Sequence, residues 1–244
     1  MNIKRRQTIA SALLTSLMLS LAAGASAQQV TLKAVNAFQE GTTYARNFEA
    51  FVKKVNDEGK GLVQINYLGG PKAIPTMEQG AALRNGVVDL SNTTTSFVAS
   101  VSPESLSVNY ATVPWAEMRR NGTLEFLNKL MMEKGLYYFA RTGDGVPYHI
   151  YLNKPISKAD LSGLKIRIAP IYREFFTRLG ASVMQVAPGE VFTALERGVV
   201  DGYGWPLLGI FDLGWHEKTR YRVDPGFYNI CLLYTSPSPR DVEE

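Results

Sequence analysis

Cysteine is almost absent from this chain, because Cys231 is the only one among its 244 residues. A single thiol cannot form a disulfide within the chain, and it has no neighbour with which to form a redox or zinc-binding pair. Histidine is nearly as scarce, and the spacing of His149 and His216 matches no metal-ligand pattern. We therefore expect no metal and no cofactor. Neither histidine is expected to be catalytic, because an imidazole base needs a placed partner.

The signature motifs of several enzyme classes are missing as well. The sequence contains no G-x-S-x-G, no Walker loop, no dinucleotide fingerprint and no H-E-x-x-H. We predict that the protein is not an enzyme. An extracytoplasmic hydrolase stays open as an alternative, because two carboxylates can converge in space without leaving a sequence motif.

The chain lacks a strong excess of charge of either sign. It has 26 lysines and arginines against 22 acidic residues, a formal net charge of +4. Three basic residues stand together at Lys4–Arg6, and the others are dispersed along the sequence. This distribution argues against a nucleic-acid partner, which requires a concentrated basic surface.

One long apolar stretch is present, Ile9–Ala23, directly behind the basic residues. The small residues Ala25–Ala27 follow it, and the whole pattern is typical of a cleavable export signal, so we assign residues 1–27 to a signal peptide. An uncleaved membrane anchor is the alternative, although serines and threonines interrupt the stretch and it is short for a span. No cysteine follows that could carry a lipid, and we predict a periplasmic location.

The last residues differ in composition from those before them. Residues 231–241 read CLLYTSPSPRD, and this Ser- and Pro-rich segment breaks the preceding pattern of strands and helices. It resembles the translation of a sequencing-library adapter. We therefore interpret residues 231–244 as a non-native tail and expect the native sequence to end near Ile230. A disordered native tail is the alternative.

Between these ends, short apolar strands alternate with amphipathic helices. Val30–Val35 and Leu62–Tyr67 are typical of strands, whereas Phe48, Val52 and Val55 have the spacing of one helix face. This alternation predicts an α/β fold with a mostly parallel sheet. It resumes after a glycine-containing loop at residues 143–145, so we expect lobe I at residues 28–145 and an incomplete lobe II at 146–230.

A short sequence motif occurs once in each predicted lobe. Ala82–Asp89 reads ALRNGVVD, and Ala194–Asp201 reads ALERGVVD. In the first copy, a helix is expected to end near Gly86, and Val87–Leu90 is expected to form a short buried strand. Because such sequences are common in α/β proteins, the repeat supports two similar lobes without proving them.

Arg167 is the first candidate for a functional residue. In Leu164–Ile168 the two-residue period of a strand places the aliphatic side chains on one face and Arg167 on the other. Open α/β sheets bind ligands beyond the carboxyl ends of their strands, and a guanidinium there can bind a carboxylate through two hydrogen bonds. A solvated arginine, or one paired with a structural acid, is the alternative.

The segments DLSGLKIRIAP and APGEVFTALERGVVDG resemble the solute-binding proteins of tripartite ATP-independent periplasmic (TRAP) transporters. The resemblance extends over about residues 30–230. It implies a two-lobed periplasmic-binding-protein-like fold with a mixed, mostly parallel sheet in each lobe, and a longer chain with further C-terminal elements. It also implies that Arg167 binds the carboxylate of a small organic acid, that the lobes close on it, and that membrane permease subunits are the partners.

Two departures from this family's pattern concern the ligand. Tyr148 stands near the place of a second arginine in many members, and Trp205 stands where many carry asparagine. With Tyr203 beside them, these aromatic residues indicate a ligand with one carboxylate and an apolar or aromatic body. Thr94 and Phe38 follow predicted strands of lobe I and are weaker candidates for the same site.

Two predictions depend on this interpretation. A chain without the implied C-terminal elements leaves lobe surfaces uncovered, so we expect it to be poorly stable and to bind weakly. A sensor domain that reports ligand occupancy to a membrane receptor is the second alternative function, and neighbouring permease genes would argue against it.

Overall fold

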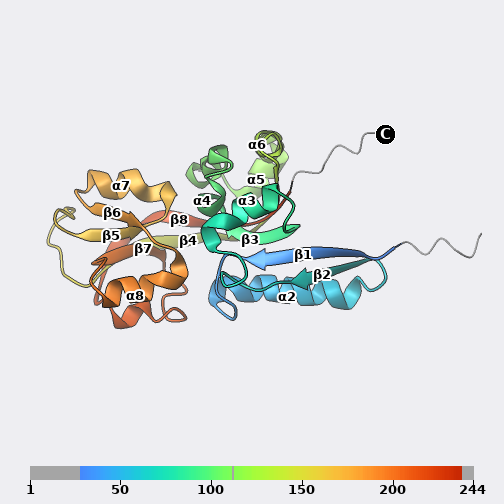
Figure 1. Cartoon of the computed structure of the whole chain (residues 1–244). Coiled ribbons are helices and arrows are strands. Elements are labelled where there is room, and N and C mark those ends of the chain that lie inside the picture. The colour runs from blue at the N-terminus through green and yellow to red at the C-terminus, as the bar shows by residue number, and fades with distance from the viewer. Residues whose placement is uncertain (1–27, 112, 238–244) are drawn as a thin grey trace, which may run out of the picture.

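The computed structural model describes residues 28–111 and 113–237, so the predicted signal peptide and the last seven residues lie outside it. Figure 1 shows two groups of strands and helices joined by long strands. The first group contains β1 (Val30–Asn36), α2 (Thr43–Glu58), β2 (Val63–Tyr67), η1 (Thr76–Glu78), α3 (Gln79–Arg84), β3 (Leu90–Thr94), α4 (Thr95–Val98), η2 (Pro103–Tyr110), α5 (Trp115–Arg120) and α6 (Thr123–Met132).

The second group follows the long strand β4 (Leu136–Leu152). It contains β5 (Lys165–Ile168), η3 (Pro170–Tyr172), α7 (Arg173–Arg178), β6 (Ser182–Gln185), η4 (Pro188–Glu190), α8 (Val191–Glu196), β7 (Gly202–Pro206) and η5 (Trp215–Glu217). A second long strand, β8 (Tyr221–Pro237), then returns toward the first group.

The strands form a sheet in the order β2-β1-β3-β8-β4-β7-β5-β6. At one end β1 pairs in parallel with β2 and β3, and at the other end β5 pairs in parallel with β6 and β7. Antiparallel pairing connects β3 to β8, β8 to β4, and β4 to β7. Each end of the sheet therefore has the mixed, mostly parallel arrangement that the sequence predicts.

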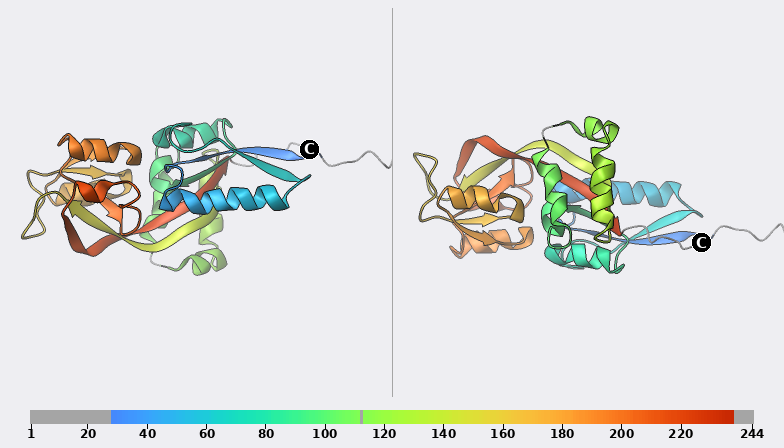
Figure 2. Two further views of the ribbon diagram at one scale, coloured as in Figure 1. Left: turned by 90° about the horizontal axis from the view of Figure 1, so that it is seen from below. Right: turned by 90° about the horizontal axis from the view of Figure 1, so that it is seen from above.

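The strands β4 and β8 run side by side through both lobes, as Figure 2 shows. Each has 17 residues, and their register shifts at several places between Tyr138 and Ile150. Such irregularities bend a strand pair locally. The predicted lobe boundary at residue 145 lies inside β4, which runs from Leu136 to Leu152.

The repeated motif has the same structure in both lobes. Gly86 and Gly198 have φ of 68° and 66°, and the amide that follows each of them bonds to the carbonyl of Ala82 or Ala194. This is a Schellman ending, for which glycine is favoured because it adopts positive φ without strain. Each copy then leads into the strand that pairs with the central strand of its lobe, β3 with β1 and β7 with β5.

The aspartate that ends each copy binds the backbone of a lysine in that central strand. The Asp89 carboxylate accepts a hydrogen bond from the amide of Lys33 at 2.7 Å, and the Asp201 carboxylate accepts one from the amide of Lys165 at 3.0 Å. In the opposite direction, the amide of each aspartate donates to the carbonyl of the same lysine. The two lobes are therefore built on a common unit.

Two predictions about elements are wrong. The strand expected at Val87–Leu90 begins only at Leu90, because Val87 completes the helix ending and Asp89 is held by Lys33. Residues 231–237 were expected to break the pattern of strands, but they form the end of β8. Leu233 and Thr235 are fully buried there, between β3 and β4.

Amphipathic helices cover the sheet in both lobes. On α2, Phe48 and Val52 are buried against Ala34, Ile65 and Tyr234, which confirms the predicted helix face. The largest buried cluster lies in lobe II and includes Phe38 and Tyr44 from lobe I. Within residues 28–111 and 113–237, every helix is too short or too polar to cross a membrane.

Candidate functional site

A cavity lies where the two lobes meet. Thr94 and Phe38 line it from lobe I, and Arg167, Tyr148 and Trp205 line it from lobe II, so five of the six predicted residues come together. The cavity encloses about 400 Å³ of space, including its mouth. The remaining lining residues are Tyr44, Ser96, Phe97, Asn109, Ala169, Tyr172, Pro206 and Tyr228.

Arg167 is fully buried on β5, the central strand of lobe II. Its Nε donates to the carbonyl oxygen of Val186 at 2.8 Å, and its Nη1 donates to the Tyr172 hydroxyl at 3.0 Å. Its Nη2 is buried and has no hydrogen-bond partner within the described part of the chain. No carboxylate there lies within ion-pair distance of the guanidinium, so Arg167 is neither solvated nor paired with a structural acid.

Trp205 forms a wall beside this guanidinium. The Arg167 Cζ atom lies 5.5 Å from the centre of the indole ring, a distance at which a cation is attracted to an aromatic face. The ring is fixed from behind by Trp215 at 4.6 Å and by Tyr44 at 5.9 Å between centroids. Trp205 Nε1 is buried without a partner among the described residues.

Tyr148 stands on β4 and is buried against two other tyrosines. Its ring centre lies 5.0 Å from that of Tyr228 and 5.8 Å from that of Tyr172. Burial raises the pKa of Tyr148 well above its ordinary value, and the neighbouring tyrosines add to this effect. The phenol is therefore neutral at physiological pH.

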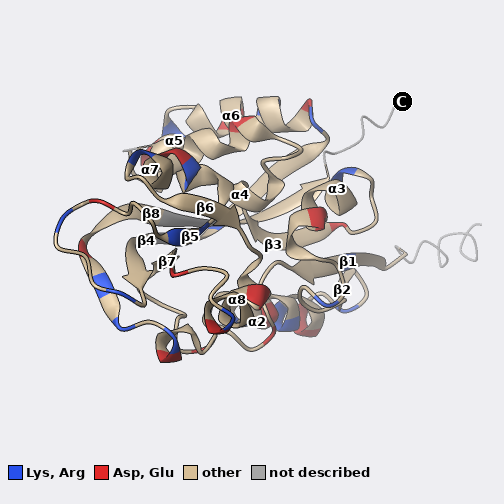
Figure 3. Cartoon of the chain, turned by 60° about the vertical axis from the view of Figure 1, so that its left-hand side comes forward, with Lys and Arg blue, Asp and Glu red and all other residues tan. Residues whose placement is uncertain are grey.

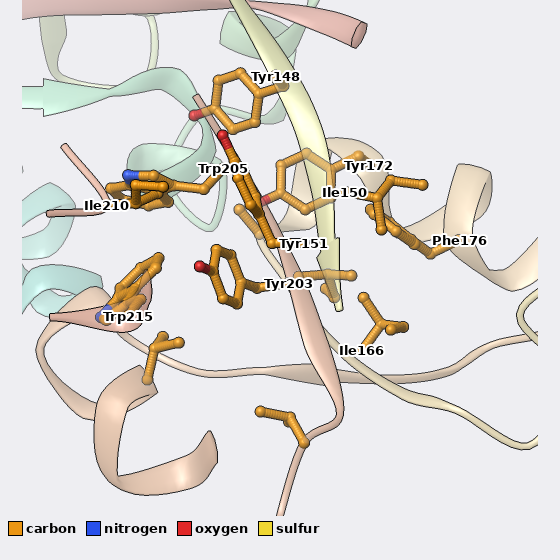
Figure 4. Close-up of a cluster of buried hydrophobic side chains, with 14 of the residues drawn as sticks. Tyr148, Ile150, Tyr151, Ile166, Tyr172, Phe176, Tyr203, Trp205, Ile210 and Trp215 are labelled. Atoms are coloured by element: carbon orange, nitrogen blue, oxygen red, sulfur yellow. The ribbon is translucent and has the colours of Figure 1, made fainter. Parts of the chain in front are cut away.

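Tyr203 lies away from the cavity, although it was predicted to contact the ligand. It is fully buried, stacks on Tyr151 at 5.2 Å between ring centroids, and its hydroxyl bonds to Thr219 at 3.0 Å. Figure 4 shows it below Trp205, next to Trp215. Tyr203 and Trp205 share one face of β7, but only Trp205 is close enough to the strand's end to reach the space between the lobes.

On the lobe I side, Thr94 ends β3 and Phe38 follows β1. The Phe38 ring packs on Tyr44 and Phe97, with centroids 5.4 and 6.0 Å apart. Thr94 Oγ1 and Asn109 Oδ1 are buried, and neither has a partner among the described residues.

Four of the eight remaining lining residues are aromatic. Tyr44 belongs to the buried face of α2, and Tyr228 belongs to β8, so each is indistinguishable from a core residue in the sequence. Tyr172 was not predicted either, and it lies in the short helix η3. Its place five residues after Arg167 was the one available signal, because the structure brings its hydroxyl to the guanidinium.

The arrangement is suited to binding a small anion. Four buried polar atoms without partners in the described chain belong to residues that line the cavity: Arg167 Nη2, Trp205 Nε1, Thr94 Oγ1 and Asn109 Oδ1. Buried polar groups are normally hydrogen-bonded, so such a cluster marks a place for a polar ligand. Among the described residues, no group of three or more His, Cys, Asp or Glu side chains could hold a metal ion.

Sequence comparison places the chain among known proteins. The family model for bacterial extracellular solute-binding proteins, family 7 (DctP), matches residues 34–234. A monocarboxylate 2-oxoacid-binding periplasmic protein of Nostoc sp. is 26% identical over 190 residues, which are 74% of this chain and 52% of that protein. A C4-dicarboxylate-binding protein of Bacillus subtilis is 27% identical over 205 residues, 79% of this chain and 57% of that protein. The chain thus spans little more than half the length of these relatives.

Solved structures share the fold. A TRAP periplasmic solute-binding protein from Pseudoalteromonas atlantica, with bound sodium and pyruvate, has a TM-score of 0.75 at 18% identity and covers 86% of this chain and 67% of its own. A TRAP solute-binding protein from Bordetella bronchiseptica, with calcium and picolinate, has a TM-score of 0.76 at 21% identity and covers 86% and 66%. These similarities confirm the two-lobed α/β fold predicted from the sequence.

Proposed function

The chain belongs to the bacterial extracellular solute-binding proteins of family 7, as its resemblance to TRAP proteins predicted, and on this premise we propose that it captures a small organic acid between its two lobes. The observation that carries the proposal is the buried guanidinium of Arg167, whose Nη2 has no partner among the described residues and belongs to a cavity lined by both lobes. The Nostoc relative is named for 2-oxoacid monocarboxylates, and the structural relatives contain pyruvate and picolinate, which supports this ligand class.

A ligand with a single carboxylate fits the cavity better than a dicarboxylate. Among the described residues that line it, Arg167 is the only charged one, and most of the others are aromatic. In the view of Figure 3, charges of both signs are intermixed on the surrounding helices and loops. A second carboxylate would lose its hydration in this cavity without gaining a cation, which is costly.

Arg167 alone does not provide tight binding. A hydrogen bond to a charged group contributes about 1.5–3 kcal/mol, whereas micromolar affinity requires about 8 kcal/mol. The remainder comes from the aromatic walls and from closure of the lobes around the ligand. The proposed setting is the periplasm, where the closed form delivers its ligand to permease subunits of a TRAP-type transporter. The division into lobes at 28–145 and 146–230 belongs to the same proposal.

Isothermal titration with pyruvate, picolinate and succinate tests this function. Pyruvate or picolinate is expected to bind more tightly than succinate. Arg167→Ala is expected to weaken binding at least about 30-fold, because removing one partner of a buried charged pair costs about 2–5 kcal/mol or more. Arg178→Ala, at the exposed end of α7, is the matched control and leaves the affinity unchanged.

Preference for succinate, or full affinity in Arg167→Ala, would contradict the proposal. The bound acid is also expected to be recovered unchanged after long incubation. Its conversion to a product would favour the hydrolase instead.

A further inference from the structure

Tyr172 connects the guanidinium of Arg167 to the backbone of a neighbouring strand. Its hydroxyl accepts a hydrogen bond from Arg167 Nη1 at 3.0 Å and donates its proton to the carbonyl oxygen of Gly204 on β7 at 3.0 Å. A tyrosine hydroxyl has a single proton. The Gly204 carbonyl can only accept a hydrogen bond, so the Tyr172 hydroxyl donates its proton to that carbonyl. The hydroxyl oxygen then accepts the hydrogen bond from Arg167.

The ring of Tyr172 is held independently of these hydrogen bonds. It packs against Phe176, Phe227 and Tyr148, with centroid separations of 5.6, 5.7 and 5.8 Å. Burial raises the pKa of Tyr172 above its ordinary value, although the charge of Arg167 acts in the opposite direction. The hydroxyl therefore keeps the proton that it donates, and its position follows from the packing of the ring.

Two contacts determine which edge of the guanidinium is free. Nε has one hydrogen and gives it to Val186, so the edge formed by Nε and Nη2 cannot receive both oxygens of a carboxylate. Nη1 gives one of its two hydrogens to Tyr172, and Nη2 keeps both of its own. Among the described groups, Nη2 is therefore the atom at the Nη end of the guanidinium that is left to receive the ligand.

We propose that Tyr172 is a positioning residue for ligand recognition, which fixes the rotation of the Arg167 guanidinium so that its Nη end receives the ligand carboxylate. The inference rests on the proposed function, and it adds a residue that does not need to touch the ligand's carboxylate. It also explains why a tyrosine follows the arginine at this distance. A phenylalanine would fill the same space but leave the hydrogen bond from Nε to Val186 as the one hydrogen bond that restrains the guanidinium within the described part of the chain.

The first test needs no ligand. Arginine side-chain NMR spectra are recorded for the protein and for Tyr172→Phe, with Arg167→Lys identifying the signals by their loss. In the wild type, restricted rotation is expected to give separate Nη1 and Nη2 resonances for Arg167. In Tyr172→Phe they are expected to merge or broaden. Separate resonances that persist in Tyr172→Phe would overturn the proposal, even if no tested acid binds.

The second test separates positioning from cavity shape. Pyruvate and its uncharged amide, pyruvamide, are titrated against both proteins. Tyr172→Phe is expected to bind pyruvate roughly tenfold more weakly, corresponding to about one charged hydrogen bond. The affinity for pyruvamide is expected to change less than twofold.

An equal loss for both ligands would assign Tyr172 a merely structural role and overturn the proposal. If the wild type binds none of the tested acids, the function proposed above fails instead, and the NMR result still decides the role of Tyr172.

Discussion

At the scale of single residues, Gly204 shows how closely the site is packed. A Cβ atom at this position would lie 3.1 Å from Phe227, 3.2 Å from Phe176 and 3.2 Å from Tyr172. Three rings would have to move at once, and each is packed against another aromatic ring. The absence of a side chain at residue 204 is therefore what allows the Tyr172 hydroxyl to reach the backbone of β7.

We predict that Gly204→Ala lowers the free energy of unfolding by about 1–3 kcal/mol, the usual range for adding a methyl group to a filled core. Urea denaturation followed by circular dichroism measures the change. Gly189→Ala is the control, because a Cβ there meets nothing within 4 Å. Equal stability of the two variants would show that the rings around residue 204 can rearrange.

Arg167 was a candidate because it is a lone cation among aliphatic strand residues, and the resemblance to TRAP solute-binding proteins is what favoured a ligand-binding role over a structural one. It could not predict Tyr44 or Asn109, whose roles depend on contacts between distant segments. Tyr203 was misplaced for a related reason. The period of a strand tells which face a side chain occupies, but the depth at which two lobes meet depends on the whole fold.

At the scale of elements, one segment of lobe II contacts the N-terminal end of α2 in lobe I. The Asp212 carboxylate accepts hydrogen bonds from the amide and the hydroxyl of Thr43, and it lies 3.7 Å from Arg46. The Tyr44 hydroxyl donates to the carbonyl of Leu208 at 2.8 Å. The first amides of a helix lack partners within the helix, so Asp212 satisfies one of them from across the cleft.

This contact is expected to weaken in acid. The hydrogen bond from the Thr43 hydroxyl holds the pKa of Asp212 below its ordinary value, and the Thr43 amide and Arg46 act in the same direction. A lowered pKa in the folded state stabilises it at pH values above the ordinary pKa of about 4. That stabilisation is lost as the pH falls through the lower folded value.

We predict that Asp212→Asn lowers the free energy of unfolding at pH 6 and that its difference from the wild type shrinks below pH 4. Chemical denaturation across this pH range measures the difference. Glu133→Gln, an exposed acid on lobe I, is the control and is expected to show no such trend. A difference that is the same at pH 3 and pH 6 would contradict the assignment.

The repeated motif supports two similar lobes more strongly in the structure than it did in the sequence. Its glycines, buried valines and terminal aspartates perform the same roles in both lobes. Predictions from local sequence patterns were wrong where contacts between distant segments determine the secondary structure. Val87 is β-branched, which favours a strand, yet it completes a helix ending. The end of β8 becomes a strand because partners lie on both sides of it.

At the scale of the whole molecule, the end of β8 joins the two halves of the sheet. Leu233 and Thr235 are fully buried and Tyr234 is nearly so, and their backbones pair with both β3 and β4. Without them, β3 would lose its only neighbour on that side. This segment is therefore a part of the core of lobe I.

We predict that a chain ending at Ile230 loses cooperative unfolding, whereas a chain ending at Pro237 keeps the stability of the full sequence. Removing a single buried leucine side chain costs about 2–5 kcal/mol, and small proteins are stable by only about 5–15 kcal/mol. Thermal denaturation of both shortened chains tests this. An unchanged midpoint for the chain ending at Ile230 would show that β8 contributes little beyond that residue.

The pair of strands β4 and β8 also limits how the lobes can move. Two hydrogen-bonded strands can bend out of the plane of their sheet, but sliding or shearing within that plane would break their hydrogen bonds. The register shifts near the middle of the pair provide places where such bending concentrates. Bending at these places therefore keeps the strand pairing, whereas sliding does not. Under the proposed closure, the strand pair itself would align Arg167 with Thr94, which line the cavity from opposite lobes.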